Sequence, residues 1–334
     1  MGFVPSIPIA FVMAVINMVC WGSWANTMKG CKGWRFEAYY WDYAVGIFVF
    51  ALIFALTLGM IPSRSTPCNF FEVLAGASPS AYGWALFSGV MWNIGNVMLV
   101  AAIVLAGYSV AFPIGIGISL VLGCLLAHAT NPSATDNPVF LFAGLALITC
   151  AIILNSLAYR ARELKKKNKT AEFKRGILLS AICGLAISMQ AFPFNYSFEA
   201  GFDGYAASVF MTLGALICTV PLVWGIMKRP LIPRQKSIGF EEYSRAKLGW
   251  HGWAILGGLI WSTGTVFNLV VANSPKFSVA IAYTLGQCAP VIAAIWGIFV
   301  WKEFRNSPKR SYGCLGLMFI LFIVGILLVA CAIG

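Results

Sequence analysis

The sequence predicts an all-α polytopic membrane protein with ten transmembrane helices, arranged as two inverted five-helix repeats with both termini outside. Three observations support this fold class. Only 10% of the 334 residues are charged and 60% are hydrophobic, whereas soluble domains carry about 25% charged residues. The apolar residues form runs of about 20 residues without a charge, which is long enough to span a bilayer. One stretch of the sequence also occurs twice.

The apolar runs are separated mostly by short connections, so no soluble domain is expected. A β-barrel would instead show short segments that alternate with period two. The first run has no Lys or Arg before Lys29, so it is interpreted as a retained helix and not as a signal peptide. The ten predicted spans lie near residues 5–27, 41–60, 83–105, 108–128, 138–158, 176–196, 205–227, 250–272, 278–300 and 312–333.

The repeated stretch covers residues 83–117 and returns 169 residues later. Without a gap, 11 of its 35 positions are identical, among them Trp92 with Trp261 and Gly95 with Gly264. Five helices in each copy place the second copy upside down in the membrane, an architecture of many secondary transporters. The predicted division is a first repeat at 1–158, a basic cytoplasmic connector at 159–175 and a second repeat at 176–334.

The net charge is +12, and nearly all of the basic residues lie on one side of this topology. Of the 23 Lys and Arg residues, 21 follow odd-numbered spans, and the other side receives only Arg64 and Lys276. The positive-inside rule makes the loops after odd-numbered spans cytoplasmic. The basic residues therefore indicate topology and contact with anionic membrane lipids, not nucleic acid, in a multi-pass protein of the cell (inner or plasma) membrane.

The predicted substrate site is uncharged, because Asp42, Glu199, Asp203 and Glu303 lie at the ends of spans. A transporter of an ionic solute usually keeps an intramembrane charge where the substrate needs it. Amides and hydroxyls next to tryptophans suit a small neutral polar solute; the alternative is that they only bond helix to helix. The candidate substrate-binding residues are Trp21, Trp24, Asn26, Trp92, Asn93, Asn96, Gln190, Trp261, Thr265, Tyr283 and Gln287. The Pro113–Gly117 segment is expected to interrupt its span beside this cavity.

The sequence does not indicate an enzyme. His128 and His251 are far apart in sequence and are both placed on the outer side, and no acid pair has a close helical spacing, so a nucleophile with its base, a metal site and a cofactor are not predicted. Asp42, near the start of the second span, is either a helix cap or a gating or coupling residue. A channel and a non-transporting receptor remain open as alternatives, as do a monomer and a homodimer.

Two segments resemble a known family. Trp21-Gly22-Ser23-Trp24-Ala25-Asn26, together with Tyr40-Trp41-Asp42-Tyr43, resembles the ureide permease group of the drug/metabolite transporter superfamily. The glucose/ribose and rhamnose-proton transporters are close to this group, and their basic-aromatic first loop is similar to Lys29, Lys32, Trp34 and Glu37 here. The resemblance covers nearly the whole chain.

The resemblance implies proton-coupled uptake of ureides, nucleobases or sugars, with Asp42 as first and Glu37 as second candidate for coupling. Plant ureide permeases carry a long central loop with a nucleotide-binding-like motif. The connector from Arg160 to Arg175 is short and lacks that motif, so nucleotide regulation is not carried over. We expect a ureide or nucleobase because tryptophans suit planar rings, with a monosaccharide as the alternative and drug or metabolite export also open.

Overall fold

The structure, a computed structural model, describes residues 5–61, 68–131, 136–163, 171–233, 235–274, 277–305 and 307–333. Every regular element within these residues is helical, which confirms the all-α prediction. The α-helices are α1 (Ile7–Ser23), α2 (Phe36–Thr57), α3 (Phe70–Gly76), α4 (Pro79–Ala106), α5 (Tyr108–Ala129), α6 (Pro138–Glu163), α7 (Ala171–Ser188), α8 (Pro193–Glu199), α9 (Gly204–Lys228), α10 (Phe240–Ser244), α11 (Leu248–Ala272), α12 (Val279–Gly286), α13 (Ala289–Ile295) and α14 (Lys309–Cys331). Short 3₁₀ segments η1 (Trp24–Gly30) and η2 (Leu58–Met60) extend α1 and α2, and a π-helical segment, η3 (Trp296–Val300), extends α13.

Ten of the described helical segments are long and apolar enough to cross a membrane, as predicted. The second span begins at Phe36, five residues before the predicted boundary, and the sixth at Ala171. Arg64, Lys276 and the run Lys165–Lys169 lie outside the described residues. The spans are Ile7–Gly30, Phe36–Met60, Pro79–Ala106, Val110–Ala129, Pro138–Ala161, Ala171–Glu199, Gly204–Lys228, Leu248–Ala272, Val279–Val300 and Lys309–Cys331.

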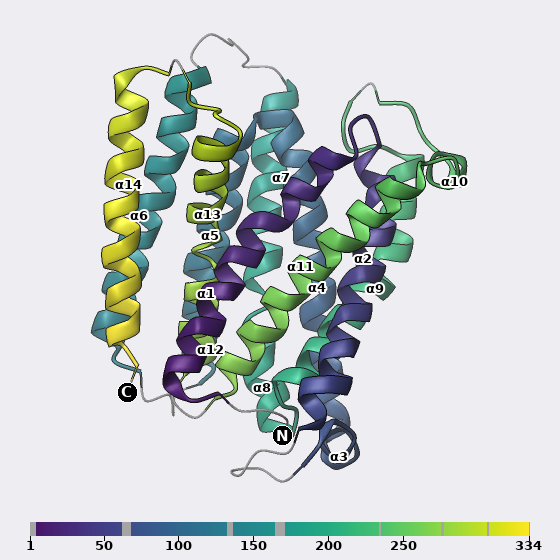
Figure 1. Ribbon diagram of the computed structural model, residues 1–334, viewed down its shortest axis with the longest axis vertical. Helices are drawn as coiled ribbons and strands as arrows, with labels where there is room; N and C mark the ends of the chain where they lie inside the picture. The colour runs from purple at the N-terminus through teal and green to yellow at the C-terminus, as the bar shows by residue number, and fades with distance from the viewer. Residues whose placement is uncertain are drawn as a thin grey trace.

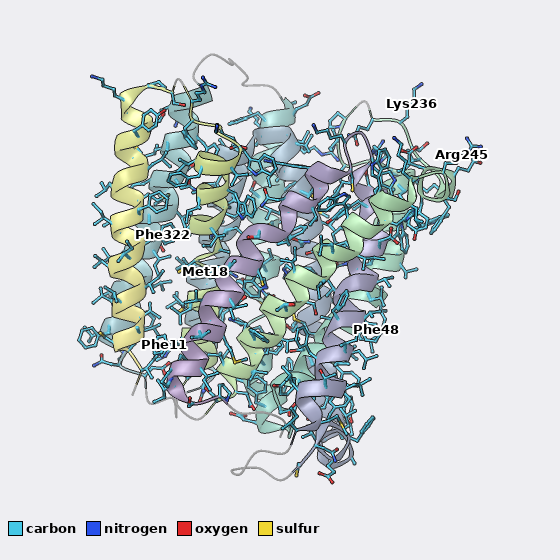
Figure 2. The ribbon with its side chains drawn as sticks, in the orientation of Figure 1. Phe11, Met18, Phe48, Lys236, Arg245 and Phe322 are labelled. Atoms are coloured by element: carbon cyan, nitrogen blue, oxygen red, sulfur yellow. The ribbon has the colours of Figure 1, made fainter. Side chains whose placement is uncertain are left out.

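The spans stand roughly side by side and alternate in direction (Figure 1). Helices α6 and α14 form one edge of the bundle, while α2, α4, α9 and α11 pack together at the opposite edge. The start of α1 and the end of α14 lie at the same end of the bundle. The connections 31–35, 229–233 with 235–247, and 301–305 with 307–308 lie at the other end, which we call the basic end; Figure 2 places Lys236 and Arg245 there.

Two helix crossings in this bundle have the same construction. In the first, α4 crosses α9: a Cβ on Gly89 would overlap the carbonyl oxygen of Met211, and one on Gly214 would overlap that of Leu86. Only glycine permits such a close approach of two backbones.

The second crossing joins α11 to α2. A Cβ on Gly258 would lie 2.6 Å from the Tyr43 carbonyl oxygen, and one on Gly46 would lie 2.9 Å from that of Ile255. Gly258 follows Gly89 by 169 residues and Gly214 follows Gly46 by 168 residues. Gly89 and Gly258 hold the same position of the duplicated stretch, whereas Gly46 and Gly214 lie outside it at an offset one residue shorter; the two crossings nevertheless show matching contacts.

Two of the spans are broken near their middle. The sixth span changes from α7 to α8 through residues 189–192, and the ninth changes from α12 to α13 at Gln287 and Cys288. Pro193 is the first residue of α8 and Pro290 the second residue of α13, and proline has no N–H to donate to the carbonyl four residues earlier.

The expected interruption at Pro113–Gly117 was wrong. Helix α5 runs without a break from Tyr108 to Ala129 and includes Pro113. Pro113 is the sixth residue of α5, so it removes a single hydrogen bond, to the carbonyl of the second residue, and the helix continues past it.

We predict that Gly89→Ala destabilises the bundle by about 1–3 kcal/mol, the usual size of an overpacking penalty. The added methyl group would meet the Met211 carbonyl and force α4 away from α9. Gly83→Ala is the matched control, because nothing lies within 4 Å of its Cβ position and both changes gain the same helix propensity. Thermal unfolding in detergent measures the difference; equal melting temperatures for the two variants would contradict the crossing.

Candidate solute-binding site

Three tryptophans form the centre of the candidate site. Trp92, near the middle of α4, and Trp261, near the middle of α11, have ring centroids 4.0 Å apart, and Trp21 of α1 stacks on Trp261 at 6.0 Å. Trp92 and Trp261 are 5% and 4% exposed. The indole N–H of Trp21 donates to Thr265 Oγ1 at 3.1 Å. Four of the predicted site residues, from three helices, are therefore brought together at mid-depth.

The two broken spans meet through a second polar group. Tyr283, in the last turn of α12, exchanges a 2.5 Å hydrogen bond with the Ser119 hydroxyl of α5, and the Gln190 side chain also interacts with the Tyr283 hydroxyl. Gln190 lies in the 189–192 break, and Ser88 of α4 donates to its carbonyl oxygen at 2.7 Å. Gln287 lies in the other break and is buried. Irregular backbone at mid-membrane is typical of transporter binding sites.

Asn17 is a site residue that sequence reasoning missed. It lies near the middle of α1 and is fully buried, with 0% of its surface exposed. Among the residues that the structure describes, neither Nδ2 nor Oδ1 has a hydrogen-bond partner. A Cβ on Gly286, the last residue of α12, would lie 2.6 Å from Asn17 Nδ2 and 2.8 Å from the Trp21 ring. The available signal was a single amide in an otherwise apolar run, Ile7–Cys20.

Asn93 and Asn96 do not join the tryptophans directly. Their amides face α2, where the Tyr40 hydroxyl donates to Asn93 Oδ1 at 2.6 Å and Asn96 Nδ2 donates to the same hydroxyl at 3.0 Å. These bonds tie α2 to α4 beside the Trp92 ring. They fit the alternative that the amides join helix to helix.

Trp24 and Asn26 lie in η1, nearer the basic end. Trp24 stacks on Tyr43 of α2 at 4.6 Å. Asn26 Oδ1 accepts a 2.7 Å bond from the indole N–H of Trp301. The structure thus places both residues between the three tryptophans at the centre of the candidate site and the basic end, and not among those tryptophans.

Asp42 is not a helix cap. It is the seventh residue of α2, and it is 7% exposed. His251 Nδ1 lies 2.5 Å from Asp42 Oδ2, and the Tyr243 hydroxyl donates to Oδ1 at 2.6 Å. Burial first, and the bond to Asp42 second, raise the pKa of Tyr243 to about 12. Tyr243 comes from α10, so this group holds α10 against the basic end of α2 and α11.

The placement of both histidines on one side was wrong. His251 lies in the first turn of α11 at the basic end, whereas His128 lies in the last turn of α5 at the opposite end and packs on Phe142. The 209 residues between Asp42 and His251 explain why spacing along the sequence did not reveal this pair.

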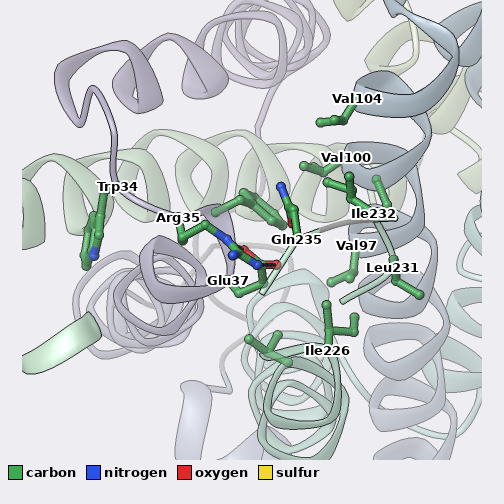
Figure 3. A pocket seen from close by; sticks show the side chains of 13 residues that line it. Trp34, Arg35, Glu37, Val97, Val100, Val104, Ile226, Leu231, Ile232 and Gln235 are labelled. Atoms are coloured by element: carbon green, nitrogen blue, oxygen red, sulfur yellow. Dashed lines mark hydrogen bonds and ion pairs between the residues drawn. The ribbon is translucent and has the colours of Figure 1, made fainter. Parts of the chain in front are cut away.

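Glu37, the second coupling candidate, is bound by Arg35. The guanidinium donates to both carboxylate oxygens, at 3.0 and 2.6 Å, a bidentate arrangement that fixes the geometry of the pair. The pair borders a cavity of about 230 Å³ at the basic end (Figure 3). None of the eleven predicted substrate residues lines this cavity, whose walls are Trp34, Arg35, Phe36, Glu37, Val97, Val100, Ala101, Val104, Val223, Ile226, Leu231, Ile232 and Gln235.

The central group has the chemistry of a binding site. It offers flat aromatic surfaces, an amide and hydroxyls, all of them uncharged, from Trp21, Trp92, Trp261, Thr265, Ser119, Gln190 and Tyr283. In the part of the chain that the structure describes, no three His, Cys, Asp or Glu side chains are placed to hold a metal ion. Such a set of groups orients an uncharged solute by hydrogen bonds and ring contacts.

The ten spans of the described residues, with two broken helices and an uncharged centre, fit a multi-pass membrane transporter of a small solute. A family model described as "Sugar transport protein" matches residues 12–332, and the chain belongs to this family. Its members and the relatives below are transporters and not enzymes, which confirms the prediction made from the sequence.

The relatives carry two kinds of name. Ureide permease 1 of Arabidopsis thaliana is 22% identical over 387 residues, covering 97% of each chain. A probable glucose uptake protein, GlcU, of Bacillus cereus is 28% identical over 73% of this chain and 77% of its own length. The glucose uptake protein GlcU of Bacillus subtilis is 27% identical, covering 71% and 74%. The resemblance to ureide permeases is thereby confirmed.

A solved crystal structure has the same fold. It superposes with a TM-score of 0.63 at 14% identity, covering 98% of this chain and 99% of that chain. At this identity the likeness concerns the fold alone.

We predict that Gly286→Ala impairs transport at least tenfold, while Gly117→Ala leaves it within about twofold. A methyl group at Gly286 would displace Asn17 and the Trp21 ring, whereas nothing lies within 4 Å of a Cβ on Gly117, the glycine at the same position of the first repeat. Initial uptake rates in proteoliposomes, normalised to folded protein, measure the effect. Equal rates for the two variants would remove Gly286 from the site.

Proposed function

We propose that this chain is a secondary active importer of a small neutral solute, most simply a ureide or nucleobase. The observation that carries the proposal is the cluster of Trp21, Trp92 and Trp261 at mid-depth, next to the uncharged amide and hydroxyl groups of the broken spans. Planar rings stack favourably on indoles, and a neutral solute requires no counter-charge. Ureide permease 1, which matches over 97% of both chains, supports the same class.

A monosaccharide is the second candidate. The family model carries the description of a sugar transport protein, and the GlcU relatives are more identical than the ureide permease over the part they cover. Aromatic rings also stack on sugar faces, and amides bond hydroxyl groups.

We further propose that the two halves, residues 1–158 and 176–334, are inverted repeats joined by the connector 159–175, and that they rock against each other to alternate access. The twin glycine crossings support this division. So does a second correspondence: α1 gives way to η1 at Trp24, and α8 begins at Pro193, 169 residues later. Placing the basic end in the cytoplasm follows the positive-inside rule and leaves both termini outside.

For the substrate, we predict saturable uptake of allantoin or uracil into proteoliposomes, in preference to ribose, glucose and rhamnose. Stacking on tryptophan favours planar solutes, and counterflow exchange of the same solute is expected because a transporter must reorient with its cargo. Radiolabelled initial rates across this panel measure the preference. Saturable entry of a sugar alone would reverse the ranking, flux without saturation or counterflow would indicate a channel, and binding without flux a receptor.

For coupling, we predict that Asp42→Asn abolishes proton-driven accumulation and spares exchange. The amide keeps the size and the hydrogen bond from Tyr243 but cannot bind and release a proton beside His251. Glu37→Gln is the comparison, because Glu37 is held by Arg35 and not by a histidine. Accumulation under an imposed pH gradient distinguishes the two carboxylates; unchanged accumulation in Asp42→Asn would exclude Asp42, and its loss only in Glu37→Gln would assign coupling to Glu37.

A further inference from the structure

Asn17 has an environment that helix packing alone does not explain. It is fully buried in α1, and neither of its side-chain polar atoms has a hydrogen-bond partner among the described residues. Most buried polar groups in native proteins are paired, and an unpaired one destabilises the fold because it loses its hydration without replacement. The packing of the described residues therefore does not explain why an amide stands at this position.

The second half of the chain offers a direct comparison. The residue 169 positions after Asn17 is Ala186, which is also buried, in α7. On the proposed repeat, the first half therefore carries a carboxamide where the second half carries a small apolar side chain.

The surroundings of Asn17 point to a ligand. Gly286, beside it, is followed by the break at Gln287 and Cys288, and Pro290 has no N–H to donate to the Gly286 carbonyl. The neighbouring Asn268 amide is occupied, since its Nδ2 donates to the Ala282 carbonyl at 2.7 Å. The Trp21 ring lies on the same side of Gly286 as Asn17, since a Cβ there would be 2.8 Å from the ring and 2.6 Å from Asn17 Nδ2. An unoccupied amide, a broken helix and an indole face therefore meet at one place.

We propose that Asn17 is a specificity-determining residue of the solute site. Its Nδ2 donates to an acceptor and its Oδ1 accepts from a donor of the same uncharged solute, while the Trp21 indole contacts the planar part. The complementary partner is an edge with an N–H next to a C=O, as in ureides and nucleobases. The inference rests on the proposed transport function and adds to it the residue that reads the hydrogen-bonding edge.

The test measures transport and stability on the same variants. Asn17→Leu removes both polar atoms at similar size, and Asn17→Ala reproduces the side chain found at Ala186, so at least one variant is expected to pack. The matched control is Asn155→Ala. Asn155 is a buried asparagine of α6 with an unpaired Oδ1, and α6 packs mainly on α5 and α14, away from the tryptophans.

We expect both Asn17 variants to raise the KM for allantoin or uracil at least tenfold, the size of one or two lost hydrogen bonds. Their melting temperature without solute should equal or exceed that of the wild type, because unpaired buried polar atoms are removed. The shift in melting temperature produced by saturating allantoin or uracil should disappear. Asn155→Ala should keep the wild-type KM and the wild-type shift.

The outcomes separate this inference from the function on which it rests. Uptake by the wild-type protein tests the proposed function by itself. If the wild type takes up none of the solutes in the panel, both the proposed function and the inference about Asn17 are overturned. An unchanged KM in Asn17→Ala, with wild-type uptake intact, would overturn the inference alone. A lower melting temperature with reduced maximal rate and unchanged KM would show a structural role for Asn17 and would also overturn it. A raised KM for ribose or glucose only would reject the ureide-type edge.

Discussion

The close approach of helix backbones at four glycines is the constraint on which the rest of the structure depends. Between lipid-exposed helices there is little hydrophobic gain from association, so packing must come from close contact. Gly89 and Gly214 permit this between α4 and α9, and Gly46 and Gly258 permit it between α11 and α2. Helices α4 and α11 are thereby held where Trp92 and Trp261 touch.

Uncharged and charged side chains lie at different levels along the same helices. The tryptophan centre is uncharged, while the carboxylate of Asp42 is paired with His251 at the basic end. That pair joins α2 to α11, the two helices that also cross at Gly46 and Gly258. The proposed coupling residue therefore lies on the helices that position Trp261, away from the uncharged centre.

The ten spans were predictable because each is an apolar run of the sequence, and the repeated stretch was visible because its residues match without a gap. The meeting of Trp92 with Trp261 followed from their identical places in the two copies. The breaks were harder to predict: Pro113 and Pro290 look alike in sequence, but Pro113 lies among the first turns of α5, whereas Pro290 follows a helix that has already ended. The Asp42–His251 pair depends on packing between distant segments, and no pattern along the chain encodes it.

The differences between the two halves are as informative as their likeness. A solute such as allantoin has no twofold symmetry, so a site built between two inverted copies must offer different groups on its two sides. The residues 169 positions after Asn17 and Trp21 are Ala186 and Gln190. The crossing glycines keep the same contacts in both halves because they serve the scaffold. In the proposed site, the groups that differ between the halves face an asymmetric solute. Trp21, Thr265 and Asn17, which lie together with the glycine that precedes the break, form the recognising side of that proposed site.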